Sequence, residues 1–278
     1  MEGIYVRGPC AYFGGMESSL DFHSARALLE WQIELGATEA IGDVPVNRFE
    51  IPDALPKAKR HAAQSDDEAV PELPPVAQVD AVTVSQRLAD ATTDLADLRR
   101  AISGFDLCEL KRGARNLVFA DGNPAARVMI VGEAPGREED KEGRPFVGPA
   151  GQLLDKMFDA IDMARDGTDQ DGSIYITNVL PWRPPQNRDP EGAEIAMMLP
   201  FLKKHVALVQ PDVLVLMGNV SCQAVLAKKG ITRLRGKWTT GFDLPVLPMF
   251  HPAYLLRNPA AKREAWNDLL SLRARLKS

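Results

Sequence analysis

Short apolar runs alternate with amphipathic helical patterns through the second half of this chain, and this alternation limits the folds available to it. The predicted strands cover residues 127–132, 174–178, 213–217 and 245–250. The predicted helices between and after them cover residues 150–163, 191–209, 220–228 and 260–276. Such alternation is typical of a parallel sheet with helices on both faces. We therefore expect an α/β fold, a three-layer α/β/α sandwich around a mainly parallel four-stranded sheet.

The first part of the chain has a different character. A helical pattern over residues 20–35 predicts an N-terminal helical segment within 1–40. Residues 41–84 are rich in Pro, Ala and acidic residues and poor in aromatics, which indicates a linker. A helix over 85–103, with Leu88, Leu95 and Leu98 on one face, then leads into the α/β domain, which we assign to residues 85–278.

No segment suggests a membrane span or a secretion signal. The chain lacks a run of about eighteen apolar residues, and its N-terminus lacks a basic segment followed by an apolar one. Cys10, Cys108 and Cys222 lie far apart without a CxxC spacing, so neither a disulfide framework nor a zinc ribbon is indicated. We expect a cytoplasmic protein of bacterial type, associated with the nucleoid, with reduced thiols.

The charge is distributed unevenly. The formal net charge of −5 disfavours a nucleic-acid ligand, but residues 1–104 hold 9 basic and 17 acidic side chains whereas 105–278 hold 24 and 21. Residues 228–278 alone hold 11 basic and 3 acidic side chains. This basic end surrounds the strand 245–250, so the sequence predicts an edge that binds a polyanion.

Three predicted strands end on polar residues: Glu133 after the first, Asn178 on the second and His251 after the last. The carboxyl ends of parallel strands meet at one edge of the sheet, so these side chains should converge on one crevice. Each also has an ordinary structural interpretation. Asn178 could cap a helix, His251 could be a partly buried histidine, and Glu133 could face solvent beside the run 138–140, which we interpret as a solvated face.

A glycine-rich loop over 143–151 precedes the helix 150–163. It lacks the Gly-Lys-Ser/Thr ending of a nucleoside-triphosphate loop, and it could either bind an anion or form plain tight turns. Phe146 in this loop could stack on a flat ligand or belong to the core.

The segment 252–257 contains two adjacent leucines, Leu255 and Leu256, followed by Arg257. They suit a wedge that enters a base stack, and core packing is the competing interpretation. Upstream, the basic loop 228–237, which includes Arg235, could contact phosphate or serve solubility alone.

Five ordered motifs together resemble the family 4 uracil-DNA glycosylases. They lie at 132–140, 143–148, 176–185, 234–236 and 251–257, and the resemblance spans about residues 105–275. It implies hydrolysis of the N-glycosidic bond of deoxyuridine in single- or double-stranded DNA, which leaves an abasic site and free uracil in base-excision repair. It also implies that the target base is flipped out of the stack.

The resemblance assigns roles to single residues. Phe146 would stack on uracil, Asn178 would read its N3 and O4 edge, and His251 would hydrogen-bond O2, where negative charge grows as the bond breaks. Glu133 would help place the attacking water, and Ala134, beside the uracil, stands where other branches of the superfamily carry Asp. Without that Asp, charge stabilisation would supply most of the catalysis.

The DNA contacts implied by the same motifs fall on the basic edge and on the segment after His251. They are Arg235, Tyr254, Leu255, Leu256 and Arg257. Either leucine could fill the space that the flipped base leaves. We expect a monomer that binds uracil-containing DNA and contacts no membrane.

The chain departs from the family at the iron–sulfur cluster, which family 4 enzymes hold through four cysteines. Cys108 matches the second ligand, whereas Phe105, Trp182 and Met198 stand at the other three positions. One thiolate cannot anchor such a cluster. We expect no metal and no cofactor, with apolar packing in place of the cluster.

Another branch of the superfamily links itself to the abasic sugar through a histidine in an insertion after the Asn motif. Residues 180–188 contain neither, so cross-linking is not expected. Two alternatives to an active glycosylase remain: a protein that binds abasic or uracil-bearing DNA and turns over poorly, or an inactive member whose segment 1–104 serves interaction.

Overall fold

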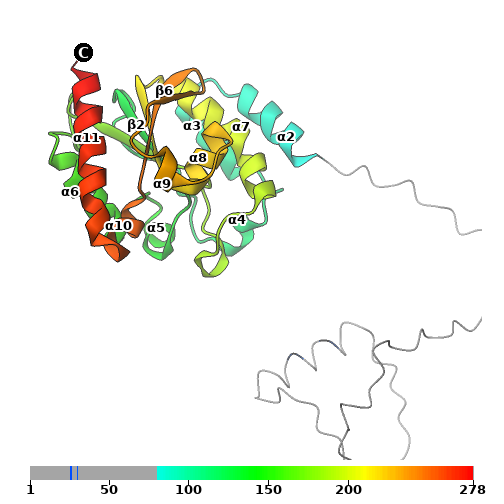
Figure 1. Cartoon of the computed structure of the whole chain (residues 1–278). Coiled ribbons are helices and arrows are strands. Elements are labelled where there is room, and N and C mark those ends of the chain that lie inside the picture. Colours follow the sequence, from blue (N-terminus) through cyan, green and yellow to red (C-terminus); the bar gives the residue numbers. More distant parts are fainter. Residues whose placement is uncertain (1–25, 27–29, 31–79, 278) are drawn as a thin grey trace, which may run out of the picture. The chain divides into compact units, whose positions relative to one another are not determined.

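The computed structural model describes residues 80–277 together with Arg26 and Glu30 (Figure 1). Of the predicted helix 20–35, only Arg26 and Glu30 are among the described residues; both are helical, and their side chains form an ion pair of 2.8 Å. The predicted linker 41–84 lies outside the described residues up to residue 79. Its last residues belong to helix α2 (Ala81–Asp90), for which the Asp80 side chain is the N-cap, so helical structure begins within the stretch predicted as linker.

A six-stranded sheet forms the centre of the described domain (Figure 1). Its strands are β1 (Asp121–Gly122), β2 (Val128–Gly132), β3 (Ile174–Asn178), β4 (Val213–Met217), β5 (Thr239–Gly241) and β6 (Leu244–Met249). The order across the sheet is β1-β3-β2-β4-β6-β5, and the four central strands run parallel, as predicted. The predicted number of strands is wrong because β1 and β5 pair antiparallel at the two edges. Both are short and consist of Asp, Gly and Thr, so no apolar alternation marks them.

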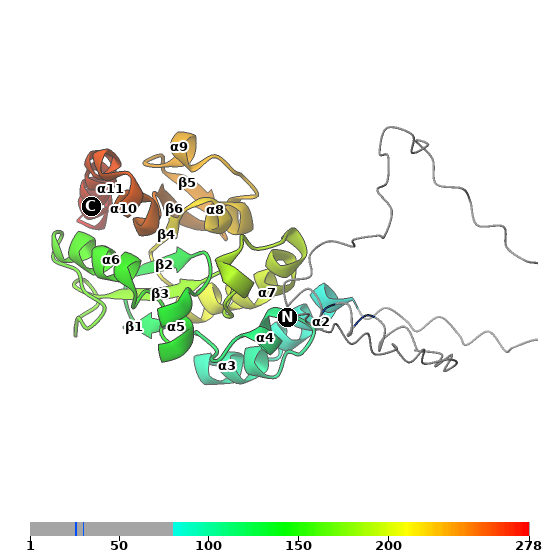
Figure 2. The ribbon, with the colours of Figure 1, turned by 90° about the horizontal axis from the view of Figure 1, so that it is seen from below.

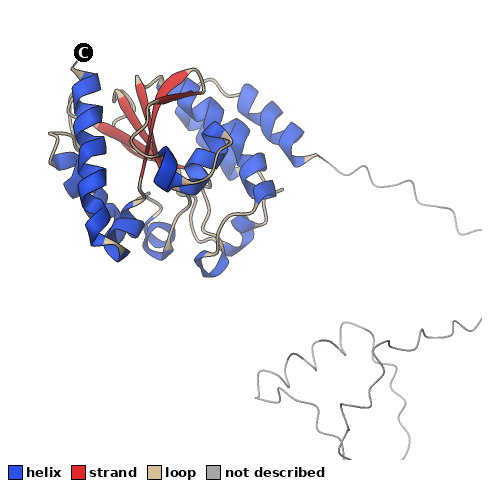
Figure 3. Cartoon of the chain, viewed as in Figure 1, coloured by secondary structure: helices blue, strands red, loops and turns tan. Residues whose placement is uncertain are grey.

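Helices cover both faces of the sheet, which confirms the three-layer α/β/α architecture (Figures 2 and 3). One face carries α6 (Pro149–Asp159), α10 (Pro252–Arg257) and α11 (Lys262–Leu276), and the other carries α2, α3 (Leu95–Ser103), α7 (Gly192–Val209) and α8 (Asn219–Leu226). The remaining short helices are α4 (Leu110–Gly113), α5 (Arg137–Glu142), α9 (Ile231–Leu234) and the 3-10 turns η2 (Pro185–Asn187) and η3 (Pro259–Ala261). No helix within the described residues has both the length and the apolar composition needed to cross a membrane.

The predicted helix 85–103 is wrong as one element, because the chain forms α2 and α3 with a turn between them. The Thr92 hydroxyl donates to the carbonyl of Ala89 at 2.7 Å, and the Asp94 side chain accepts from the backbone N–H of Asp97 at 2.7 Å. Thr and Asp favour such turn and cap contacts over the helix interior. The Thr-Thr-Asp sequence therefore ends one helix and starts the next.

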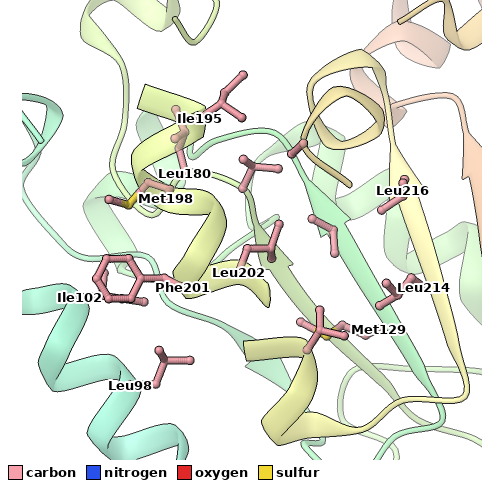
Figure 4. Close-up of a cluster of buried hydrophobic side chains, with 14 of the residues drawn as sticks. Leu98, Ile102, Met129, Leu180, Ile195, Met198, Phe201, Leu202, Leu214 and Leu216 are labelled. Carbon is pink, nitrogen blue, oxygen red and sulfur yellow. The ribbon is translucent and has the colours of Figure 1, made fainter. Parts of the chain in front are cut away.

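The central strands are mainly apolar because both of their faces are buried. In β2, Met129 and Val131 belong to the hydrophobic cluster under α7, whereas Val128 and Ile130 belong to the cluster under α6 and α11. Figure 4 shows the first cluster, in which side chains from the sheet meet side chains from α3 and α7. This packing fixes the strands and the loops that follow their carboxyl ends.

Candidate active site

The ends of β2 and β3 lie side by side, with Gly132 and Asn178 as register partners. A Cβ atom on Gly132 would overlap the Asn178 side chain and would lie 2.6 Å from the ring of Phe146. The Phe146 ring in turn stacks on the ring of His251, with 5.4 Å between centroids and 28° between planes. The structure thus places Phe146, Asn178 and His251 close together beside the ends of β2 and β3.

Asn178 carries an unused hydrogen-bonding group. Its side chain is 7% exposed. Among the described residues, its Oδ1 atom is the one buried side-chain nitrogen or oxygen without a hydrogen-bond partner. Buried polar groups are almost always hydrogen-bonded, so an orphan of this kind needs an explanation. A ligand that donates a hydrogen bond to this oxygen would satisfy it.

His251 is held in one orientation by the helix that it begins. It is the N-cap of α10, and its Nδ1 atom accepts a hydrogen bond from the backbone N–H of Ala253 at 3.2 Å. Burial lowers the pKa of His251 to about 4, aided by the positive charge of Arg257 and opposed by Glu139. At neutral pH the ring is therefore neutral. Because Nδ1 accepts, Nε2 bears the proton and can donate it.

Glu139 organises the loop that presents Phe146. Its carboxylate accepts hydrogen bonds from the backbone N–H groups of Gly136 at 3.1 Å, Val147 at 3.0 Å and Gly148 at 2.9 Å. Next to it, Asp140 is buried and accepts from the backbone N–H of Arg115 at 2.8 Å. The prediction that 138–140 is a solvated face is therefore wrong for these two carboxylates. The spacing of Gly136 and Glu139, typical of a capping box, could have indicated it.

Glu133 follows directly after β2. Its carbonyl oxygen accepts from the backbone N–H of Leu180 at 3.1 Å, which fixes the main chain beside the end of β3. The side chain is half-buried, and desolvation, with a contribution from the charge of Asp189, raises its pKa above the usual range for Glu. Ala134 is also half-buried and packs against the cluster under α7. The position of Glu133 at a strand end and its raised pKa are typical of a residue in an active site.

The sequence matches a known family over this same region. The model of the uracil DNA glycosylase superfamily matches residues 119–270, which is more than half of the chain. The chain belongs to this superfamily. It is 38% identical over 189 residues to a type-4 uracil-DNA glycosylase of Sulfurisphaera tokodaii, covering 64% of this chain and 83% of that protein.

The chain is also similar in sequence to two further type-4 uracil-DNA glycosylases. The protein of Pyrobaculum aerophilum is 36% identical over 185 residues, which are 63% of this chain and 91% of that one. The protein of Thermotoga maritima is 40% identical over 156 residues, which are 54% of this chain and 77% of that one. The chain is thus a type-4 member of the uracil-DNA glycosylase superfamily.

Arg235, predicted to contact DNA in this superfamily member, is engaged within the protein. Its guanidinium pairs with the buried carboxylate of Asp268, donates to the carbonyl of Glu264 at 2.8 Å and lies 5.7 Å from the centroid of the Phe250 ring. A guanidinium used in this way ties α11 to the loop before β5. The exposed basic side chains of the loop 228–237 are Lys228, Lys229, Arg233 and Lys237, and Arg257 is exposed at the end of α10.

The two leucines after His251 have different environments. Leu255 is 1% exposed and belongs to the cluster under α6 and α11, whereas Leu256 is 45% exposed. Tyr254 lies between His251 and these leucines in the sequence. Its ring stacks on that of Phe250, with 4.8 Å between ring centroids. Only Leu256 is accessible to a ligand on this surface, and the core interpretation applies to Leu255.

The four positions that the type-4 resemblance assigns to iron–sulfur ligands all lie in one hydrophobic cluster. Each of these residues is at most 3% exposed: Phe105, Cys108, Trp182 and Met198. The Phe105 ring packs edge-on against the Phe201 ring, with 5.4 Å between centroids. Burial raises the pKa of the Cys108 thiol, which favours the protonated form. Phe and Trp provide no ligand atom, so this donor set does not fit a four-cysteine cluster. Among the described residues, no group of three or more His, Cys, Asp or Glu side chains could hold a metal ion.

Proposed function

We propose that this chain hydrolyses the bond between uracil and deoxyribose in DNA, releasing free uracil and leaving an abasic site. The observation that carries the proposal is the convergence of Phe146, Asn178 and His251 around the orphan Oδ1 atom of Asn178. A flipped base would enter this pocket from DNA bound along the edge of the sheet where the strands end.

Asn178 would select uracil by its hydrogen-bonding edge. The orphan Oδ1 would accept the N3–H of uracil, while the amide nitrogen would donate to O4. Cytosine presents the opposite pattern, with an acceptor at N3 and a donor at C4, so it would leave the buried amide unsatisfied. Phe146 would stack on the face of the base.

His251 would stabilise the leaving base. As the glycosidic bond breaks, negative charge grows on uracil O2, and the Nε2–H of the neutral ring would donate to it. The ring needs no reorganisation during the reaction, because the Ala253 amide already fixes its orientation and tautomer. The sugar acquires oxocarbenium character, so the nucleophile is needed only late.

Glu133 would place and polarise the attacking water. It is half-buried at the end of β2, and Ala134 supplies no second carboxylate beside it. Charge stabilisation of the departing uracil would therefore supply most of the rate enhancement.

The DNA contacts fall on the exposed part of the basic edge. Leu256 would fill the space left by the flipped base, and Arg257 with the lysines of the loop 228–237 would contact phosphates. Tyr254 is half-buried and stacks on Phe250. Arg235 would act indirectly, by holding the loop in place through Asp268.

We also propose that the enzyme contains no iron–sulfur cluster, because three of its four ligand positions hold Phe105, Trp182 and Met198 in a packed apolar environment. To test this, the protein is purified once in air and once without oxygen. The visible absorption spectrum and the iron content of both preparations are then measured. One cluster per chain would contradict the proposal.

The remaining proposals concern the whole chain: a monomer, with the activity in residues 85–278, and location at the nucleoid, where its DNA substrate is. Sedimentation analysis of the full chain tests the first. Imaging of the fluorescently tagged chain against a DNA stain tests the last.

The decisive experiment compares single-turnover and multiple-turnover excision from a labelled single-stranded oligonucleotide that contains one uracil. Alkali cleavage reveals the abasic sites, and the unmodified chain is compared with His251→Ala. Repeated turnover that falls in the variant by about 100-fold to 1000-fold supports the glycosylase. One product per enzyme would indicate a protein that holds abasic DNA, and DNA binding without product would leave only the binding function.

A further inference from the structure

Phe146 has a backbone conformation that an aromatic residue rarely adopts. Its φ angle is +54°, in the left-handed region that favours glycine. Such a conformation persists only where surrounding contacts hold it, and it is often found at functional sites. The contacts that hold Phe146 therefore bear directly on the orientation of its ring.

Arg165 contacts the carbonyl oxygens on both sides of this strained position. It lies in the loop after α6, its side chain is 12% exposed, and it donates to the carbonyl oxygens of Pro145 at 3.0 Å and Phe146 at 2.9 Å. The same guanidinium pairs with Asp121 at 2.8 Å and Asp155 at 2.7 Å.

The hydrogen bonding of Arg165 is complete. Its Nε donates to Asp155, one terminal nitrogen donates to Asp121 and Pro145, and the other donates to Asp155 and Phe146. These bonds use all five N–H groups of the guanidinium in its planar fork. A side chain engaged in this way has one orientation, so it can fix the two carbonyl groups precisely where the loop turns.

The C-terminal side of Phe146 is held by Glu139, which accepts from the N–H groups of Val147 and Gly148. Gly151 leaves room for the arrangement, since a Cβ atom there would overlap the carbonyl oxygen of Phe146. Arg165 thus fixes the carbonyl oxygens of this loop, and Glu139 fixes its N–H groups. The ring between them faces Gly132 and His251.

We propose that Arg165 is a positioning residue for uracil excision: it holds Phe146 in its left-handed conformation so that the ring is already placed to stack on the flipped base. Asp121 and Asp155 orient Arg165 and balance its charge. The inference rests on the proposed role of Phe146 and extends it to a residue that contacts neither the base nor the reacting atoms.

Arg127 provides a matched control for the test. It too pairs with two carboxylates, Asp171 at 2.8 Å and Asp212 at 2.5 Å, and donates to a backbone carbonyl, that of Leu276 at 3.1 Å. It precedes β2 and so lies at the opposite end of the strands from the site. Replacing either arginine removes a similar network, but only one network contacts Phe146.

The experiment measures single-turnover excision, inhibition by free uracil and thermal unfolding for Arg165→Met, Arg165→Lys and Arg127→Met. We expect Arg165→Met to slow excision by about 10-fold to 100-fold, because a displaced Phe146 ring would misplace the base in the reaction. For the same reason, inhibition by free uracil should weaken. Arg165→Lys should recover part of the rate. Arg127→Met should lower thermal stability and keep the excision rate of the unmodified chain. Equal rates for Arg165→Met and Arg127→Met would overturn the proposal.

A double-mutant cycle with Phe146→Ala tests whether Arg165 acts through the ring. If it does, adding Arg165→Met to Phe146→Ala should slow excision little further, whereas independent, multiplied losses would overturn the inference. If Phe146→Ala alone excises at the normal rate, the stacking role itself fails. If Phe146→Ala is slow and Arg165→Met is not, only the positioning role fails. If Arg165→Met does not fold, Arg165→Lys replaces it in the double-mutant cycle. Lysine keeps the positive charge but lacks the planar guanidinium and its five N–H groups.

Discussion

Asn178 occupies the space that a side chain on Gly132 would need. The two residues are register partners at the carboxyl ends of β3 and β2. Because residue 132 is glycine, the amide of Asn178 and the ring of Phe146 can both reach the end of β2. The placement of the two side chains proposed to bind the base therefore depends on a strand residue that has no side chain of its own.

Substitution of Gly132 tests this dependence. Gly132→Ala should reduce single-turnover excision by about 100-fold, because Asn178 or Phe146 must move to admit the methyl group. Gly192→Ala is the matched control, since a Cβ atom there meets nothing within 4 Å. An active Gly132→Ala variant would show that the pocket tolerates a shift of these groups.

Asn178→Asp should lose most of its activity on uracil. An ionised carboxylate accepts the N3–H of uracil but cannot donate to O4, and an unsatisfied buried group costs about 1–3 kcal/mol, or roughly 5-fold to 150-fold in rate. Protonation restores a donor, so the ratio of variant to unmodified rates should rise as the pH falls. Asn123→Asp, whose amide instead donates to Ser173 Oγ at 3.1 Å, should show no such trend. A ratio for Asn178→Asp that does not change with pH would contradict the donor role.

The stability of the fold should fall in mild acid. Burial lowers the pKa of His205 to about 3 and that of His251 to about 4. Between these values and the ordinary pKa of about 6.5, the unfolded chain binds protons that the folded chain does not. The contribution of these histidines is therefore complete above about pH 6.5 and is lost progressively below it. Urea unfolding at about pH 7 and about pH 5.5 measures the change.

The variant His205→Phe separates this effect from other titrations. His205 accepts or donates a hydrogen bond with Tyr175 at 2.9 Å and stacks on Phe119, and it lies away from His251 in the cluster under α7. The variant should lose stability at neutral pH by about 1–3 kcal/mol, because the Tyr175 hydroxyl loses its partner. It should also show a smaller decrease between the two pH values. An unchanged decrease would exclude His205 as a source.

The adjacent leucines offer a matched pair. Leu255→Ala should lower the free energy of unfolding by about 2–5 kcal/mol, because it leaves a cavity in the core. Leu256→Ala should change stability by less than about 0.5 kcal/mol. It should slow excision more from double-stranded than from single-stranded DNA, since only a duplex has a vacated space to fill. Equal effects on both substrates would contradict the wedge role.

Cys108 tests the absence of a cluster from another direction. Cys108→Ala should leave the excision rate, the iron content and the visible spectrum as in the unmodified chain, and should lower stability by about 1 kcal/mol because a small buried group is lost. Cys222→Ala, also buried, is the control. A loss of iron or of visible absorption in Cys108→Ala alone would point to a bound metal group.

The central strands could be predicted from the sequence because each is mainly apolar, as in 213–217, where every residue is buried. The strand ends pointed to Glu133, Asn178 and His251, and the motif over 143–148 pointed to Phe146. Asp94 marked the division of the helix 85–103, but the leucine pattern on both sides of it obscured the turn. The edge strands β1 and β5 have too few residues to show the alternation of apolar and polar residues that predicts a strand.

Other features of the site depend on contacts that join distant segments. Arg235 is a basic residue in a basic loop, and only the fold brings it to Asp268. Leu255 and Leu256 are identical in type, and only the direction of α10 separates the buried one from the exposed one. Arg165 has no motif around it, and its importance follows from the five hydrogen bonds that it donates to four groups.

The lobe built around Phe105, Trp182 and Met198 also has a consequence for how the protein matures. Packed side chains are in place as soon as the chain has folded, so a chain without the cluster, as proposed, requires no delivery of iron and sulfide during assembly. Cells grown without sufficient iron should accumulate the active protein to the same level as cells grown with sufficient iron. Repair of deaminated cytosine would then continue under the conditions that deplete cluster-bearing relatives.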